Sequence, residues 1–243
     1  MMMRTIAVDT STSALSVALL ENQTCIVNTF AATTQQHGER LLPEVAHLFE
    51  PVGWQPSQIE RVVVGVGPGS YTGLRIGVTF AKTWSVAKNV PLTTVSSLAL
   101  LAAHTEKCES DIVVPLMDAR RMSAYTAAYR WQNNQLVTIL ADCHADWEDY
   151  LPQLAALEGA RIVFVGEKIG AFVQKFQELY PQKEVAVVEG IFPNVALLEY
   201  VEQTAVFDPT TLAPNYAHAT VAEQEWLAQT QGNQEDEWVE QFS

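Results

Sequence analysis

The sequence predicts an α/β fold of two tandem lobes, each built on a mixed five-stranded sheet with helices. The order of apolar patterns, βββαβαβα, occurs twice, and each cycle opens on a strand that runs into an aspartate, Val8-Asp9 and then Met117-Asp118. The 243 residues are 48% hydrophobic, enough for two cores, which argues against disordered and fibrous classes. We therefore expect lobes at residues 1–108 and 109–222, followed by a mobile acidic tail at 223–243.

The first cycle begins with three short β-type runs separated by turn signals, which predict an antiparallel meander. Leu41, Leu42, Val45, Leu48 and Phe49 then recur at helical spacing and predict an amphipathic helix. The remaining elements expected in this lobe are a strand at 61–65, a glycine-rich turn at 67–73, a helix at 74–88, a strand at 91–95 and a helix at 97–107.

The second cycle repeats this order. A strand is expected at 112–117, and Asn133-Asn134 predicts the turn of a hairpin between strands at 125–129 and 136–140. The remaining elements expected there are a helix at 146–157, a strand at 161–165, a helix at 169–180, a strand at 185–188 and a helix at 194–206. The repeated order predicts a structural duplication of the two lobes.

Charge is unevenly placed along the chain. The sequence holds 28 acidic and 14 basic residues, a formal net charge of −14. Residues 1–140 contain ten of each sign, so residues 141–243 carry the whole net charge with 18 acidic and 4 basic residues. Nucleic-acid binding needs clustered Lys and Arg, so this composition argues against direct binding of RNA or DNA.

Cysteine and histidine spacing argues against a metal site. The three cysteines are far apart without a CxxC pair, and the five histidines form no HxxxH or HExxH pair. The cysteine pattern also argues against a disulfide framework. No run of about 20 apolar residues occurs, and the N-terminus lacks a signal-peptide pattern. We expect a cytoplasmic chain that does not enter a membrane.

The segment from Gly65 to Gly77 is the most informative in the sequence. A strand, a glycine-rich turn and a helix start can seat a phosphate, with Gly69 and Ser70 as candidate contacts. The segment lacks the Lys of a P-loop and the flanking glycines of a nucleophile elbow. The alternative is a tight turn in which Ser70 or Thr72 caps the helix.

The helix after this turn carries small residues at every fourth position: Gly73, Gly77, Ala81 and Ser85. Glycine in a helix interior costs about 1 kcal/mol relative to alanine, so a packing reason is expected. One hypothesis is an intermolecular surface, shared with the helix around Leu41. The other is that the whole apolar arc, including Ile76, Phe80, Trp84 and Ala87, covers the chain's own sheet.

Polar residues end the first strand of each lobe. Asp9, Thr10 and Ser11 could hold a metal-bound nucleotide phosphate. A two-metal nuclease is not indicated, because Glu44 could supply one further carboxylate but the fourth strand ends in Val66-Gly67 without the other. Asp118 and Arg120 could grip an anion in the cleft between the lobes or form an interlobe salt bridge.

Several motifs together resemble the TsaB (YeaZ) family. They are Ile6 to Thr12 with Ala14 to Leu19, His37 to Pro43, Gly67 to Gly77, Asp118-Ala-Arg120 with Tyr125, and Pro214-Asn-Tyr216. The resemblance implies the actin-like, sugar-kinase and Hsp70 superfold of duplicated ribonuclease-H-like lobes. Two positions depart from the family pattern: Ser123 stands where Glu is common, and His218 where Arg is common.

The resemblance also implies a function in making N6-threonylcarbamoyladenosine (t6A) beside the anticodon of tRNA. In that pathway the TsaD-type transferase is catalytic, TsaB is its non-catalytic partner, and the ATPase TsaE joins the assembly. Family members pair with TsaD or form homodimers, and tRNA contact would be indirect. No cofactor of its own is implied, with ATP or ADP and metal expected in the partner proteins. Consistent with this, Leu41 stands four residues after His37, where the transferases carry the second histidine of a metal pair.

The predicted partner surface comprises nine residues of the first lobe: Leu41, Leu42, Val45, Leu48, Gly73, Gly77, Phe80, Ala81 and Trp84. On this hypothesis, Gly77→Leu or Ala81→Trp leaves the chain folded but abolishes partner binding. The alternative function is a small actin-fold ATPase or kinase that uses Asp9 and Asp118 across the cleft. A peptidase has no supporting Ser-His-Asp, Cys-His or zinc constellation.

Overall fold

A computed structural model describes residues 2–32 and 37–217 of the chain. Its strands are β1 (Arg4–Asp9), β2 (Ala14–Glu21), β3 (Thr24–Ala32), β4 (Arg61–Gly65), β5 (Leu92–Val95), β6 (Ile112–Asp118), β7 (Ser123–Gln132), β8 (Gln135–Asp146), β9 (Ile162–Gly166), β10 (Val185–Glu189) and β11 (Gln203–Val206). Its α-helices are α1 (His37–Val52), α2 (Tyr71–Lys88), α3 (Ser97–Ala102), α4 (Trp147–Ala155) and α5 (Gly170–Leu179). Short 3-10 turns are η1 (Pro56–Gln58), η2 (Val195–Tyr200) and η3 (Pro209–Thr211).

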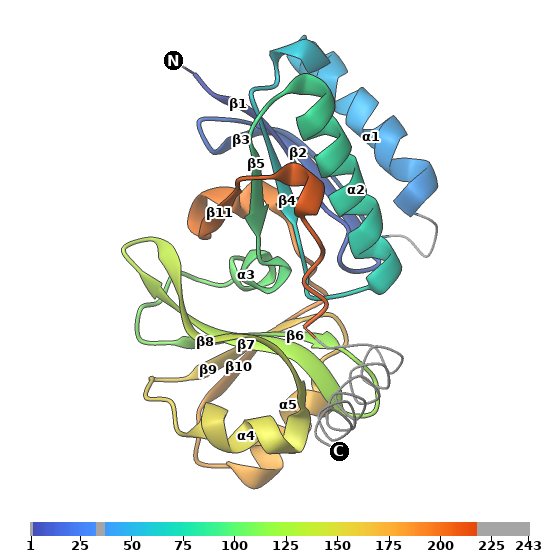
Figure 1. The fold of residues 1–243 in the computed structure, drawn as a ribbon. Helices are drawn as coiled ribbons and strands as arrows, with labels where there is room; N and C mark the ends of the chain where they lie inside the picture. Colours follow the sequence, from blue (N-terminus) through green and yellow to red (C-terminus); the bar gives the residue numbers. More distant parts are fainter. Residues whose placement is uncertain (1, 33–36, 218–243) are drawn as a thin grey trace, which may run out of the picture.

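Two sheets repeat one topology (Figure 1). The first has the order β11-β5-β4-β1-β2-β3 and the second β10-β9-β6-β7-β8. In each, the first three strands form an antiparallel meander, and the next two add in parallel to the first strand. This ribonuclease-H-like order confirms the predicted duplication.

The end of the second lobe differs from the prediction. The helix expected at 194–206 is wrong, because the chain forms only η2 and then extends into β11. Strand β11 pairs antiparallel with β5 of the first sheet, Ala205 opposite Thr93, and so makes that sheet six-stranded rather than five-stranded. Pairing with an otherwise open sheet edge satisfies backbone groups over a distance that local periodicity does not report. Gln203–Val206, expected in the second lobe, therefore belongs to the first sheet, and the tail expected at 223–243 lies outside the described residues.

Helix α3 is shorter than the 97–107 expected and ends at Ala102. Its residues are buried on all sides, because it lies between the two sheets (Figure 1). One apolar core contains α3 together with side chains of both sheets, such as Val63 and Val113. Two further cores lie on the outer faces, under α1 and α2 in the first lobe and under α4 and α5 in the second.

Asparagine residues adopt positive φ in both tight hairpin turns, including the one predicted at Asn133-Asn134. Asn133 and Asn134 at the β7–β8 turn have φ of 50° and 62°, and Asn22 and Gln23 at the β2–β3 turn have 51° and 73°. Positive φ at both central residues gives the turn a twist that matches the strands. Among the helices that the structure describes, none has the length and hydrophobicity needed to cross a bilayer.

Candidate functional site

An apolar groove runs between α1 and α2 on the outer face of the first lobe. These two helices lie side by side over the sheet (Figure 1). The groove has a volume of about 630 Å³. Its lining consists of Gly38, Leu41, Leu42, Thr72, Arg75, Ile76, Thr79, Phe80, Thr83, Trp84, Ala87 and Lys88. Of these described lining residues none is acidic, so a largely apolar trough carries two cations at its rim.

Aromatic packing forms the floor of the groove. Trp84 stacks on Phe49 with ring centroids 6.2 Å apart and contacts Phe80 at 5.5 Å. Leu42 is 64% exposed although its neighbour Leu41 is buried. The Trp84 indole N–H is buried without a hydrogen-bond partner in the described part of the chain. A wide apolar arc with an exposed leucine is typical of a protein-contact surface.

Only part of the nine-residue surface predicted from sequence lies in this groove. Leu41, Leu42, Phe80 and Trp84 line it, whereas Val45 and Leu48 are buried in the first lobe's own core. Sequence reasoning left out the rim cations, Arg75 and Lys88. Lys88 stands four residues after Trp84 and so shares its helical face, which was the available signal for this residue.

The small residues of α2 face the interior of the first lobe, so they do not form the intermolecular surface offered as one hypothesis. A Cβ added to Gly73 would lie 2.1 Å from the Thr10 carbonyl oxygen, and one added to Gly77 would lie 2.4 Å from Thr10 Oγ1. The Thr10 hydroxyl donates to the Gly73 carbonyl at 2.7 Å, and Ala81 is fully buried. For the small residues of α2, the interpretation that the apolar arc packs on the chain's own lobe is confirmed. Substitution of Gly77 by leucine would therefore disturb the fold and cannot report partner binding alone.

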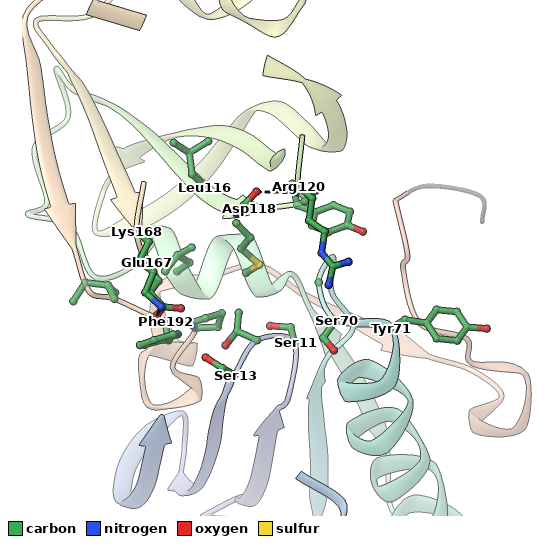
Figure 2. A pocket seen from close by; sticks show the side chains of 18 of the residues that line it. Ser11, Ser13, Ser70, Tyr71, Leu116, Asp118, Arg120, Glu167, Lys168 and Phe192 are labelled. Carbon is green, nitrogen blue, oxygen red and sulfur yellow. Dashed lines mark hydrogen bonds and ion pairs between the residues drawn. The ribbon is translucent and has the colours of Figure 1, made fainter. Parts of the chain in front are cut away.

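A second concavity, the cleft between the lobes, has a volume of about 820 Å³. Figure 2 shows Ser11 and Ser70 of the first lobe facing Asp118 and Arg120 of the second across it. Five residues of the predicted phosphate or cleft site line it: Ser11, Gly69, Ser70, Asp118 and Arg120. Asp9 and Thr10 are absent from the lining and lie beneath it, so the seven predicted residues are not brought together.

The carboxylate of Asp9 is enclosed rather than presented to the cleft. Its Oδ1 accepts hydrogen bonds from the Ser11 amide at 2.9 Å and hydroxyl at 2.6 Å, and its Oδ2 accepts from the Ser97 hydroxyl at 2.5 Å. Asp9 is 1% exposed, and burial raises its pKa against these hydrogen bonds, which lower it. Gly65 approaches the same carboxylate so closely that an added Cβ would lie 1.9 Å from Oδ2. This carboxylate joins β1 to α3 and has no open face for a metal ion.

The glycine-rich turn closes on the chain itself. The Ser70 amide donates to the Ser11 carbonyl at 2.7 Å, and the Ser70 hydroxyl accepts from the Gly73 amide at 3.3 Å. A Cβ on Gly69 would lie 2.2 Å from the same Ser11 carbonyl. Ser70 is therefore the N-cap of α2, which confirms the tight-turn alternative and uses amides that a phosphate would need.

The predicted interlobe salt bridge of Arg120 is not formed among the described residues. The Arg120 amide donates to Asp118 Oδ1 at 2.7 Å within the same loop. A different group joins the lobes: Asp142 accepts from the Ser96 hydroxyl at 2.5 Å and from the Tyr129 hydroxyl at 2.6 Å. Burial raises the pKa of Asp142 and, more strongly, that of Tyr129.

The second lobe contributes charges of both signs to the cleft. Glu167 and Lys168 line it and pair with each other at 3.0 Å. His37 begins α1, with its Nε2 2.7 Å from the Thr12 carbonyl oxygen. Among residues 2–32 and 37–217, no group of three or more His, Cys, Asp or Glu side chains is placed to hold a metal ion.

The last described residues return to the first lobe along α2. The Asn215 amide donates to the Val66 carbonyl at 2.8 Å, and Lys82 Nζ donates to the Leu212 carbonyl at 2.8 Å. Tyr216 stacks on Tyr71 at 4.7 Å and accepts a hydrogen bond from Arg75 Nε at 3.0 Å. The Pro214-Asn-Tyr216 motif therefore fixes the chain beside the α1–α2 groove.

Comparison with known proteins shows the relationship. The chain is 30% identical to the tRNA threonylcarbamoyladenosine biosynthesis protein TsaB of Bacillus subtilis, over 93% of this chain and 98% of that protein. The chain belongs to the TsaB family. A TsaB protein of Escherichia coli is 34% identical over 54% of this chain and 57% of its own length. Two α/β lobes, each built on its own mixed sheet, are thus the architecture of this TsaB-family chain.

A family model and a solved structure extend this relationship. The model described as "TsaD: tRNA N6-adenosine threonylcarbamoyltransferase" matches residues 26–226. The structure of YeaZ from Pseudomonas aeruginosa is 26% identical, with a TM-score of 0.74 over 88% of this chain and 99% of that one. The TsaB family and the TsaD model thus share most of the length of this chain.

Proposed function

We propose that this TsaB-family chain takes part in tRNA threonylcarbamoyladenosine biosynthesis as a non-catalytic subunit that binds and activates a TsaD-type transferase. The names of its curated relatives support the pathway. The observation that carries the proposed binding is the α1–α2 groove, about 630 Å³ in volume, with Leu42 exposed at its edge. A monomer gains nothing from exposing such a surface in water, so we assign it to a protein partner.

The enclosed strand end supports a non-catalytic role. In a nucleotide-using enzyme of this superfold, we would expect the carboxylate after β1 to face the cleft. Here Asp9 accepts hydrogen bonds from Ser11 and Ser97 within the described part of the chain, and the amide of Ser70 is bound to a carbonyl. The alternative, a small ATPase or kinase, predicts tight Mg-ATP binding with turnover by the isolated chain. Calorimetric titration with Mg-ATP distinguishes the two, and our proposal expects neither binding nor turnover.

Further parts of the proposal concern the assembly. A TsaE-type ATPase would join the pair, and the chain alone would form a homodimer through the same face. ATP or ADP and metal would belong to the partner proteins. Contact with tRNA would be made by the transferase, since an acidic chain with a net charge of −14 repels a phosphate backbone.

The decisive experiment replaces the exposed leucine of the groove. Leu42→Asp places a carboxylate where an apolar contact is proposed, and its burial without a partner group weakens binding. We expect the affinity for the TsaD-type transferase of the same cell to fall at least about tenfold, or about 1.4 kcal/mol. Titration calorimetry measures this, and t6A formation in a reconstituted assay should fall in parallel.

The matched control is Leu179→Asp. Leu179 ends α5 in the second lobe and is 53% exposed, so it receives the same change away from the groove. Both variants should keep the circular dichroism spectrum and unfolding midpoint of the native chain. Equal transferase affinity in Leu42→Asp and Leu179→Asp would remove the groove from the proposed interface.

A further inference from the structure

The electrostatics of the groove are distinctive within a chain this acidic. Its described lining contains two charged residues, Arg75 and Lys88, and both are cations. An apolar trough with a cationic rim is complementary to a segment that combines large apolar side chains with carboxylates.

Such a segment exists in this chain. Residues 218–243 contain six acidic residues and no Lys or Arg. Two apolar groups, Trp226-Leu227 and Trp238-Val239 with Phe242, are interleaved with these carboxylates. Tryptophan and phenylalanine are also the side chains that most often anchor a protein interface.

This segment begins close to the groove, because the described chain ends at residue 217, one residue after Tyr216. Tyr216 is bound to Arg75, which itself lines the groove. Thr72 and Lys88, at opposite ends of the lining, are 16 residues apart on α2, or about 24 Å at 1.5 Å per residue. The eight residues between residue 217 and Trp226 can span up to about 30 Å. Trp226 can therefore reach any point along the groove.

We propose that residues 218–243 occupy the α1–α2 groove of their own chain and compete there with a protein partner, either the transferase or a second copy of the chain. The identity of the competing protein rests on the proposed function, whereas occupation of the groove by residues 218–243 does not. A tether this short gives an effective concentration on the order of millimolar, so even a weak contact fills the groove. If the groove is covered ten times as often as it is open, the partner's apparent affinity falls about 11-fold. The segment would thus set the threshold at which the subunits associate.

The test uses the full-length chain and a variant in which Trp226, Leu227, Trp238 and Phe242 are all replaced by serine. A matched control carries Gln229, Gln231, Asn233 and Gln241 replaced by serine in the same segment. Methyl NMR signals of Leu42 and Ile76 report the groove directly. We expect these signals, recorded at a concentration where light scattering shows a monomer, to move in the apolar-to-serine variant and to stay in place in the control.

Two outcomes would overturn the inference. Methyl signals that are identical in all three proteins would show that the segment does not enter the groove. Signals that differ between the native chain and the apolar-to-serine variant only at concentrations where the chain dimerises would assign the groove to a second copy of the chain.

Affinity for the transferase separates this inference from the proposed function. With both correct, the apolar-to-serine variant binds the transferase at least about fivefold more tightly than the native chain or the control. If Leu42→Asp leaves transferase binding unchanged, the proposed function fails, while the methyl signals still decide whether the segment occupies the groove.

Discussion

Thr10 determines the size of the residues that α2 can carry. Its hydroxyl and carbonyl press against the helix at Gly73 and Gly77, where a Cβ would come within 2.4 Å of Thr10 atoms. Each glycine costs the helix about 1 kcal/mol in propensity. The close approach, with the hydrogen bond from Thr10 to the Gly73 carbonyl, offsets this cost.

Substitution of Gly77 by alanine tests this packing. We expect Gly77→Ala to lower the free energy of unfolding by about 1–3 kcal/mol, because overpacking outweighs the gain in helix propensity. Gly170→Ala is the control, since nothing lies within 4 Å of the added Cβ at the start of α5. That variant should be neutral or up to about 1 kcal/mol more stable. Urea denaturation measures both, and a stabilised Gly77→Ala would contradict the packing described.

At this scale the sequence predicted which residues share a face but not what that face contacts. Helical periodicity identified the line of Gly73, Gly77 and Ala81, yet its contact, Thr10, lies more than 60 residues away in sequence. Likewise the strand end at Asp9 was predicted, whereas its burial depends on Ser97. Such contacts are set by tertiary packing, which no local pattern records.

At the level of the helices and strands, the N-cap residue of α3 forms a hydrogen bond between the two lobes. Ser96 caps α3 by accepting from the Ala99 amide at 3.1 Å, and its hydroxyl also donates to Asp142 of β8. Asp142 and Tyr129 come from the second lobe and Ser96 from the first. The N-cap of α3 therefore also stabilises a partly buried carboxylate of the other lobe.

Ser96→Ala should cost more than loss of a cap. We expect about 2–4 kcal/mol at neutral pH, from about 1 kcal/mol for the cap and about 1–3 kcal/mol for a partly buried carboxylate that loses a donor. Burial raises the Asp142 pKa, and the Ser96 hydrogen bond lowers it, so the substitution raises that pKa further. The charged form alone loses stabilisation, so the cost shrinks as the pH falls through this raised pKa.

The control for this prediction is another N-cap. Asp146 caps α4 at an exposed position by accepting from the Glu148 amide at 3.1 Å. Asp146→Ala should cost about 1 kcal/mol. Chemical denaturation of both variants from about pH 4, near the ordinary carboxyl pKa, to about pH 7 makes the comparison. Equal costs in the two variants at neutral pH would contradict the role given to Asp142.

Element order was predictable from sequence because each strand and helix has its own hydrophobic period. The turn at Asn133-Asn134 was predictable because few residues adopt positive φ. Strand β11 was missed because its four residues gain strand structure only by pairing with β5, about 110 residues earlier. A short segment at a sheet edge is defined by its partner and not by its own pattern.

The two lobes share one core in the whole molecule. Leu98, Leu100 and Leu101 of α3 are buried between the sheets, in contact with a core that includes residues of both. Loss of either sheet would expose this helix to water. The lobes should therefore unfold together rather than one after the other.

Leu100→Ala tests this cooperativity. We expect a loss of about 2–5 kcal/mol, with a single unfolding transition retained. Indole NMR signals of Trp84 and Trp147, one in each lobe, should disappear at the same urea concentration in the native chain and in the variant. Leu179→Ala, at an exposed position, should change stability by less than about 0.5 kcal/mol. Separate midpoints for the two indoles would show that the lobes unfold independently.

Strand β11 has a consequence for synthesis of the chain on the ribosome. The first sheet begins at Arg4 but gains its last strand only when Gln203–Val206 has been made. Until then the outer edge of β5 has unpaired backbone groups, and such an edge can pair with another nascent chain. We expect the interval between emergence of β5 and of β11 to be the period in which this protein most needs a chaperone.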